Sequence, residues 1–246
     1  MAQDYRAPYS VGTGTAAEID RGLRAHMLHV YNYMASGVLL TGIVALLVSN
    51  MAVTDAGQLT SFGQAIYLSP LKWAVILSPL ALVMVMSFGL NKLSLFALQA
   101  TFWVYAGLMG LSLSSIFLMY TGESIAKVFF ISAGMFGGLS LFGYTTKKDL
   151  GPVGKFMFMG LIGILIASVV NIFMASSMMS FVISVIGVVV FAGLTAYDTQ
   201  KIKELYYAGY GEEQTAKLSL MGALSLYLDF INLFMMLLRL FGNSRN

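Results

Sequence analysis

The chain has 246 residues, of which 58% are hydrophobic and only 10% are charged, whereas a soluble domain usually has about 25% charged residues. So few charges cannot cover the surface of a soluble globule of this length, which excludes an ordinary cytosolic enzyme, a disordered chain and a coiled coil. We therefore expect an all-α polytopic membrane protein that is integral to the lipid bilayer.

The charged and reactive residues narrow the function further. Although the net charge is +3, Lys and Arg occur singly between apolar runs and form no basic patch, so no nucleic-acid partner is expected. The lack of cysteine removes disulfides, thiolate nucleophiles and cysteine metal sites. His26 and His29 have no second cluster of His or Glu with which to complete a zinc centre. We expect no cofactor and no enzymatic activity.

Residues 1–24 are polar and mixed in charge, and we expect them to form a cytosolic N-terminal tail. The apolar stretch that follows is too long for the hydrophobic region of a signal peptide and has no convincing cleavage site. It is therefore expected to be a first, uncleaved transmembrane helix. Residues 25–246 are expected to form a single transmembrane domain of seven helices.

Charges and polar loops divide the first half of the chain into four expected spans. A polar loop follows the first of them, and their positions are 27–51, 72–90, 94–119 and 127–146. The fourth span has small residues four apart, which favour close packing of helices within the molecule, with a dimer face as the alternative. These small residues are Ala133, Gly134, Gly137 and Gly138.

The second half of the chain contains an apolar segment too long for one helix. From Phe156 to Tyr197 there are 42 residues without a charge. One helix of that length would extend about 63 Å, twice the ~30 Å thickness of the hydrocarbon core, so the segment must fold back. The natural turn lies at residues 175–177. The last three spans are therefore expected at 155–174, 179–199 and 217–240.

The distribution of Lys and Arg predicts the orientation, because cytosolic loops carry an excess of both. With the N-terminus in the cytosol, ten Lys and Arg residues lie inside, and the four outside are Lys72, Lys127, Arg239 and Arg245. The last helix therefore either crosses the membrane despite its two C-terminal arginines or re-enters as a shorter segment. Both alternatives are compatible with the sequence.

Ionisable side chains at hydrophobic depth are the main candidates for function, since each is costly there unless it is paired or hydrated. Asp229 lies near the middle of the seventh span, and Asp198 closes the sixth. Without a functional role, Asp229 could be a protonated acid that is hydrogen-bonded to Ser or Asn across helices. Asp198 could instead be a helix-end carboxylate that pairs with Lys201 or Lys203.

Other polar residues in the spans have structural interpretations. Arg239 lies about 15 Å along the helix from Asp229, so it is expected to anchor the helix end or to form a latch to another helix. Four uncharged or neutral side chains are expected to make interhelical hydrogen bonds or to lie at the membrane interface: His29, Asn32, Gln99 and Asn171.

Two segments carry a resemblance to a known family. Residues 193–203 read GLTAYDTQKIK, and residues 223–234 read ALSLYLDFINLF. Together they resemble the Bax inhibitor 1 family, also called the TMBIM superfamily, in its bacterial branch. The resemblance implies a seven-helix membrane protein in which six helices surround the last one. It also implies a location in the bacterial inner membrane.

The resemblance further implies a pH-sensitive calcium leak. In the family, two aspartates matching Asp198 and Asp229 form a hydrogen-bonded pair that senses protons and lies on the ion path. Tyr197 and Asn232 fall within the matching segments and are expected to support this pair, together with Arg239. Some bacterial members have an arginine in the second helix that pairs with the first aspartate, but the span 72–90 of this chain contains none.

The chemistry of two adjacent carboxylates fits this role. Two such groups within hydrogen-bond range cannot both ionise cheaply in a low-dielectric site, so they share a proton and titrate as a unit. Loss of that proton leaves two charges that attract Ca²⁺. Two aspartates provide far fewer than the 6–8 oxygens of a tight calcium site, so Ca²⁺ would bind transiently at Asp198 and Asp229, as conduction requires.

The depth of the two aspartates is the main difficulty. Asp229 is about 18 Å along its helix from Lys217, whereas Asp198 is only three residues from Lys201. They meet only if the sixth helix continues well past Lys201 or if the seventh begins late.

Two other functions remain open. Bacterial relatives are associated with a membrane-bound AAA protease, so residues 1–24 could bind such a partner. Paired aspartates in neighbouring helices are also found in intramembrane aspartyl proteases, but the Gly-x-Gly-Asp and Pro-Ala-Leu elements of those enzymes are missing here.

Overall fold

The computed structural model describes residues 16–54, 56–207 and 209–245. Within these ranges the chain is almost entirely helical, and its β-pairing is limited to two isolated bridges. Most of the predicted cytosolic tail, residues 1–15, lies outside the described residues.

The helices run along the chain as follows: α1 (Ala16–Ala52), α2 (Ser61–Tyr67), α3 (Leu71–Gly89), α4 (Leu95–Leu113), α5 (Ile116–Met119), α6 (Gly122–Thr145), α7 (Gly151–Met174), α8 (Ser177–Glu204) and α9 (Glu212–Phe241). In the described part of the chain seven segments are long and apolar enough to cross a membrane, with α4 and α5 together forming one of them. The prediction of an all-α protein with seven spanning helices is confirmed. The short helix α2 was not predicted, and it lies in the expected polar loop.

The long apolar segment folds back where the sequence predicts. Ala175 ends α7 in the left-handed backbone region with φ 50°, and the Ser176 hydroxyl accepts a hydrogen bond from the Met179 amide to cap α8. Asn171 reinforces the turn, because its side-chain oxygen accepts from the Ser176 amide and its Nδ2 donates to Ser180 Oγ at 2.7 Å. The turn thus holds the end of α7 close to the start of α8.

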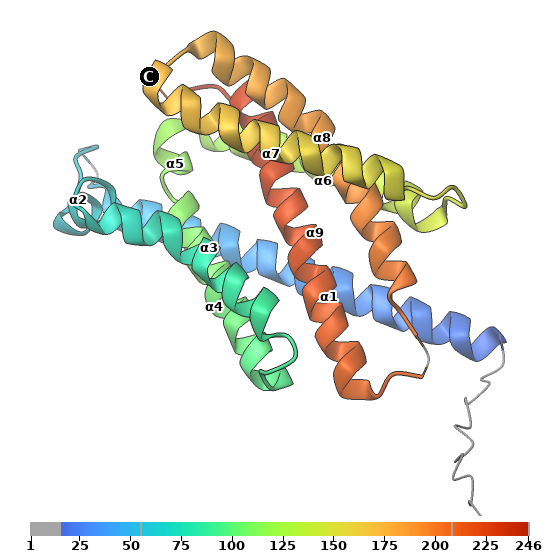
Figure 1. Ribbon diagram of the computed structural model, residues 1–246. Coiled ribbons are helices and arrows are strands. Elements are labelled where there is room, and N and C mark those ends of the chain that lie inside the picture. The colour runs from blue at the N-terminus through green and yellow to red at the C-terminus, as the bar shows by residue number, and fades with distance from the viewer. Residues whose placement is uncertain (1–15, 55, 208, 246) are drawn as a thin grey trace, which may run out of the picture.

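Helix α9 is the most buried of the spanning helices. In its most hydrophobic stretch 72% of residues are buried, against 6% in α7. It packs against α8, α1, α6 and α4, whereas α3 packs mainly on α4 and α7 on α8 (Figure 1). The implied arrangement of six helices around the last one is therefore not confirmed, since the structure packs α9 mainly against four.

Contacts at its two ends establish that α9 extends through the whole molecule. Near its start, Ser219 Oγ lies 2.8 Å from Nδ1 of His26 in the first turns of α1. Beyond its end, the Arg245 amide donates to the carbonyl of Met119, and the Thr121 amide donates to the carbonyl of Asn243. The chain therefore leaves α9 beside the connection between α5 and α6, as a complete crossing requires and a re-entrant segment does not.

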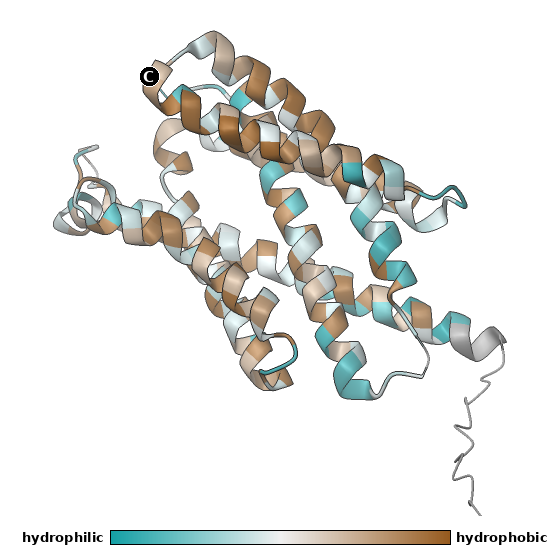
Figure 2. Ribbon diagram, in the orientation of Figure 1, coloured by the Kyte–Doolittle hydropathy of each residue, from teal (hydrophilic) through white to brown (hydrophobic). Residues whose placement is uncertain are grey.

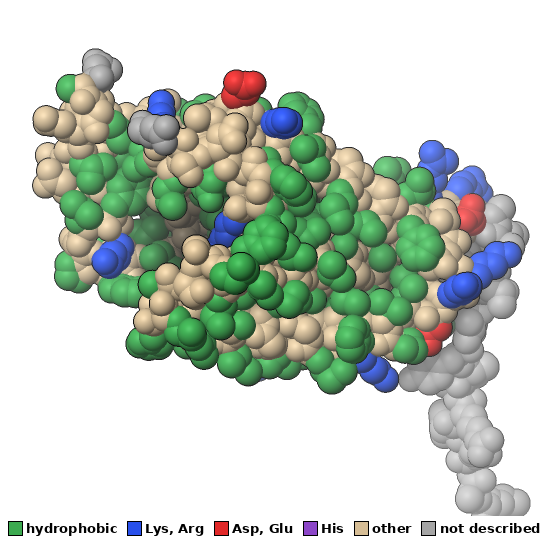
Figure 3. Space-filling model, turned by 90° about the horizontal axis from the view of Figure 1, so that it is seen from above, with side chains coloured by type: hydrophobic (Ala, Val, Ile, Leu, Met, Phe, Trp, Pro, Cys, Tyr) green, Lys and Arg blue, Asp and Glu red, His purple; other side chains and the backbone are tan. Residues whose placement is uncertain are grey.

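The surface of the helices is that of a protein surrounded by lipid. Hydrophobic residues cover the central parts of the helices, and hydrophilic residues gather toward their ends (Figure 2). Large apolar side chains point outward, among them Phe88, Phe130 and Phe173, which are 74% to 85% exposed. In Figure 3 most charged side chains lie at the ends of one such apolar face.

Close helix packing depends on glycines other than those singled out in the sequence. A Cβ added to Gly134, Gly137 or Gly138 of α6 would meet nothing within 4 Å, so these residues do not mediate packing inside the molecule. A Cβ on Gly143 of the same helix would instead overlap the backbone carbonyl of Ala196 in α8. The prediction that Gly134, Gly137 and Gly138 pack against a neighbouring helix of the same molecule was therefore wrong. Apolar periodicity does not reveal which face of a membrane helix meets protein.

The two classes of glycine make a testable contrast. We expect Gly143→Ala to destabilise the protein by about 1–3 kcal/mol, because the new methyl group forces α6 and α8 apart. Gly138→Ala is the matched control, and it should be neutral or slightly stabilising because alanine favours the helix. Thermal unfolding in detergent measures both, and equal effects of the two substitutions would contradict the packing described here.

Candidate functional site

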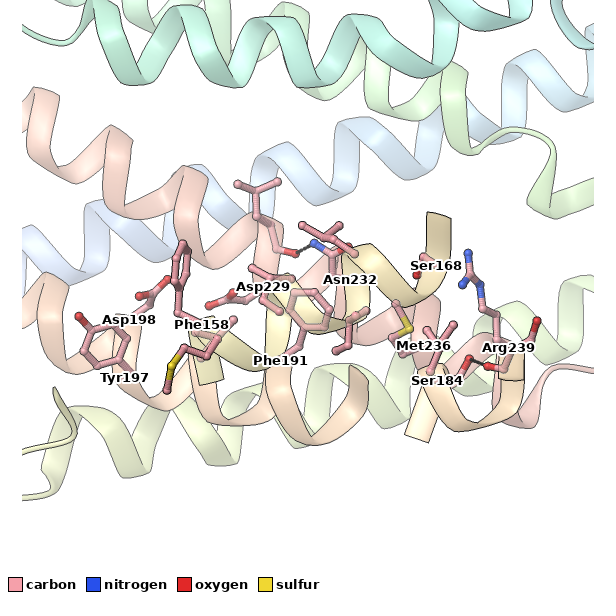
Figure 4. A pocket seen from close by; sticks show the side chains of 18 of the residues that line it. Phe158, Ser168, Ser184, Phe191, Tyr197, Asp198, Asp229, Asn232, Met236 and Arg239 are labelled. Atoms are coloured by element: carbon pink, nitrogen blue, oxygen red, sulfur yellow. Dashed lines mark hydrogen bonds between the residues drawn. The ribbon is translucent and has the colours of Figure 1, made fainter. Parts of the chain in front are cut away.

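A large cavity of the described structure lies between α7, α8 and α9. Its volume is about 1480 Å³, and it contains both aspartates singled out from the sequence. Tyr197 and Asp198 lie toward one end, Asp229 and Asn232 lie in the middle, and Arg239 lies at the other end (Figure 4). The cavity therefore brings all five candidate residues together.

The register of α9 against α8 explains why the two aspartates meet. Gly222 packs against Ile202, and Gly187 packs against Met236, so the two antiparallel helices are paired along most of their length. In this register Asp198 is level with about Leu226, roughly one helical turn from Asp229. The difficulty of depth disappears because α9 begins at Glu212 and extends beyond the end of α8 at Glu204. Lys217 is therefore not level with Lys201.

Asp229 is buried, and at least one of its carboxylate oxygens lacks a hydrogen-bond partner in the described structure. Its side chain is 4% exposed, and within the described residues its Oδ2 atom has no hydrogen-bond partner. The nearby amide of Asn232 does not supply one, since its Nδ2 donates to the Leu228 carbonyl of its own helix. The alternative of a structural acid bonded to Ser or Asn across helices is thus not observed.

Asp198 is half-buried and faces the same cavity. Lys203 Nζ donates to the Tyr144 carbonyl. Lys201 Nζ lies 5.9 Å from the centre of the Tyr197 ring and close enough to Asp198 for the two charges to interact. Within the described residues Asp198 forms no salt bridge. No direct hydrogen bond joins the two described aspartates, but they lie close enough for their charges to interact.

The residues around Asp198 in the motif hold α8 against its neighbours. The Tyr197 ring packs directly on Gly154 at the start of α7. Thr199 Oγ1 lies 2.9 Å from Ser140 Oγ, which in turn lies 2.8 Å from the Tyr31 hydroxyl, so α8, α6 and α1 are joined. These contacts fix the position of Asp198 without using its carboxylate.

Gln200 completes this arrangement at the first turn of α7. Its Oε1 accepts from the Leu150 amide, and its Nε2 donates to the Lys148 carbonyl, both at 2.8 Å. The side chain therefore satisfies backbone groups at a buried helix start that lacks a side-chain cap of its own. The motif that carries the family resemblance thus anchors both α6 and α7 around one carboxylate.

Sequence reasoning missed two buried polar contacts of α9. The Tyr227 hydroxyl lies 2.6 Å from Thr41 Oγ1, and its ring contacts Tyr105, whose own hydroxyl is buried without a partner among the described residues. The bond between His26 and Ser219 is the second. In the sequence these residues stand among apolar neighbours without a distinguishing pattern, apart from the position of Tyr227 two residues before Asp229.

The expected interhelical hydrogen bonders have mixed outcomes. Gln99 Nε2 donates to the Tyr33 hydroxyl at 2.7 Å, which links α4 to α1, and Asn171 links α7 to α8. His29 and Asn32 are exposed on α1, and the described contacts include no hydrogen bond for either side chain.

Arg239 forms no latch in the described structure. Its side chain is exposed at the cavity end farthest from Asp198, and no hydrogen bond or ion pair to another described residue is found for it. Helix α3, where some family members have an arginine, contributes no residue to the cavity. A gating partner for Asp198 is therefore not found on that helix.

The donor set limits what the cavity can bind. Within the described residues no group of three or more His, Cys, Asp or Glu side chains is placed to hold a metal ion. Two carboxylates with hydroxyl and amide neighbours can bind a hydrated divalent cation weakly, with water supplying most of its 6–8 oxygens.

Comparison with known proteins gives a consistent result. The family described as "Inhibitor of apoptosis-promoting Bax1" matches residues 23–246. Similar proteins include an uncharacterized protein of Rickettsia prowazekii, 50% identical over 92% of this chain and 93% of that protein, and one of Caulobacter vibrioides, 44% identical over 92% of both. The inner membrane protein YbhL of Escherichia coli is 47% identical over 91% of this chain and 94% of that protein.

The proximity of the aspartates can be tested by crosslinking, since the chain has no cysteine of its own. We expect Asp198→Cys combined with Asp229→Cys to be joined efficiently by a short bifunctional thiol reagent in membranes. The control pair is Asp198→Cys with Arg239→Cys, because Arg239 lies about 15 Å farther along α9. Proteolysis between α8 and α9 followed by electrophoresis detects the crosslink. Absence of crosslinking in the first pair, or equal crosslinking in both, would contradict the register.

Proposed function

The chain belongs to the family of the inhibitor of apoptosis-promoting Bax1, and on that premise we propose that it is a pH-sensitive calcium leak of the bacterial inner membrane. The observation that carries the proposal is the pair of carboxylates in one cavity, of which Asp229 is buried with an unpartnered oxygen. A buried carboxylate without a partner is costly at membrane depth, which makes function the default interpretation.

In the proposed closed state the two aspartates come within hydrogen-bond distance of each other and share a proton. Two ionised carboxylates this close repel each other in a medium of low dielectric constant, so the singly protonated pair is favoured. The shared proton then links α8 to α9 and leaves little charge to attract a cation. The anchoring of α8 by Thr199 and Gln200 keeps Asp198 in place while the proton is held.

Loss of the proton opens the path in two ways. The charges on Asp198 and Asp229 repel each other, which loosens the contact between the helices, and together they attract Ca²⁺ into the cavity. The ion keeps most of its water, since Asn232, Ser184 and Ser168 offer only neutral polar atoms beyond the carboxylates. Weak binding of this kind permits release as well as entry.

The orientation belongs to the same proposal. Because ten of fourteen Lys and Arg residues fall on the N-terminal side of the membrane, we infer that the N-terminus lies in the cytosol. The location in the inner membrane follows the name of the Escherichia coli relative. Binding of an AAA protease through residues 1–24 stays a prediction, because residues 1–15 lie outside the described structure.

Calcium flux into proteoliposomes tests the role of the pair. We expect Asp198→Asn and Asp229→Asn each to lower the flux at mildly basic pH by about tenfold, since each removes a charge that attracts the ion. Asp149→Asn is the matched control, because Asp149 is exposed in the loop before α7 and bonds only the Gly151 amide in the described structure. Flux equal to that of empty liposomes would refute the leak, and flux unchanged in both variants would refute the role of the pair.

The pH dependence has a defined sign. Because the shared proton closes the path, the leak should increase as pH rises through the range in which the pair releases that proton, and it should fall again on acidification. Both Asn variants should lose this dependence, because neither retains a pair that can share a proton. Calcium flux measured from acidic to mildly basic pH checks this prediction. A larger flux at acidic pH than at basic pH would contradict the proposed mechanism.

A further inference from the structure

The end of the cavity near Arg239 differs from the end that contains the aspartates. The guanidinium faces the cavity from the last turn of α9, and among the described lining residues no carboxylate lies on that side of Asp229. Its neighbours there are neutral, with Ser168 and Ser184 beside it in Figure 4. An arginine at the membrane edge without a described counter-charge is complementary to an anion.

The walls of this part of the cavity are continuous with the lipid-facing surface. Leu165 and Ile172 of α7 and Phe181 of α8 line the cavity, yet their side chains are 58%, 76% and 58% exposed. Helix α7 packs mainly on α8, so the cavity is bounded by α9 on one side and by a poorly buried helix on the other. In a bilayer, an apolar wall of this kind is in reach of acyl chains.

We propose that this end of the cavity is a binding site for an anionic phospholipid. The phosphate group pairs with the Arg239 guanidinium, and one acyl chain lies along the apolar wall formed by α7 and α8. Arginine suits this role because its planar fork donates two hydrogen bonds to phosphate oxygens. Ser168 provides a further donor beside the headgroup, whereas the Ser184 hydroxyl already donates to the Ser180 carbonyl.

A lipid satisfies both halves of the site at once. A free phosphate ion would neutralise Arg239 but would leave the apolar wall without a partner, and a zwitterionic lipid would cover the wall with a headgroup of no net charge. The proposal concerns binding alone and does not depend on calcium flux.

Native mass spectrometry of the purified full-length protein, released from micelles doped with equal amounts of phosphatidylglycerol and phosphatidylcholine, tests the site. We expect the wild-type protein to retain phosphatidylglycerol preferentially and Arg239→Gln to reduce that retention by about tenfold. Arg239→Lys should restore part of it, because the positive charge remains. Ser168→Phe should also reduce retention, since the new ring fills the cavity while Arg239 is unchanged.

Arg245→Gln is the matched control. Arg245 lies at the same end of the molecule, donates to the Phe117 carbonyl and does not line the cavity, so its substitution should leave retention unchanged. Equal loss in both glutamine variants, or equal retention of the two lipids by the wild type, would overturn the proposal. Displacement of phosphatidylglycerol by millimolar inorganic phosphate would also overturn it, because it would assign the site to a free anion. Circular dichroism confirms that each variant is folded.

Discussion

The antiparallel packing of α9 on α8 is the contact on which the rest of the site depends. Gly222 against Ile202 and Gly187 against Met236 set its register, and a shift of either helix by one turn would separate the two aspartates. Because the protein interior is closely packed, such a register has discrete alternatives rather than a continuous range. The positions of the two carboxylates are therefore fixed by apolar contacts on either side of them.

Polar contacts hold the other faces of α8. Thr199 and Ser140 join it to α6 and α1, and Gln200 joins it to the start of α7. In the membrane these bonds have no water to compete with them, although measured values for such interhelical bonds are modest, about 0.6 kcal/mol on average. Their effect here is positional: they leave the carboxylate of Asp198 directed at the cavity.

The number and order of the spanning helices could be read from the sequence, because hydrophobic length and charge position depend on the bilayer alone. The turn at Ala175 followed from the same arithmetic. The faces of the helices could not be read, because residues that meet lipid and residues that meet protein are equally apolar. That is why Gly138 was given a packing role that belongs to Gly143, and why the partner of Tyr227 on α1 was not foreseen. Asp229 was identified by its depth and Asp198 by the family motif, whereas their proximity required the register of α9, which no local pattern encodes.

The attachment of α7 has a consequence for how proteins of this kind can diverge. Side chains hold it at its two ends, through Gln200 at the start and Asn171 near the turn, while most of its length is poorly buried. Substitutions along its cavity face therefore disturb few packed neighbours, unlike those on α8 and α9. Residues of α7 that line the cavity can therefore be substituted at little cost to the stability of the fold. Changes in the cavity lining should therefore accumulate on α7 rather than on α8 or α9.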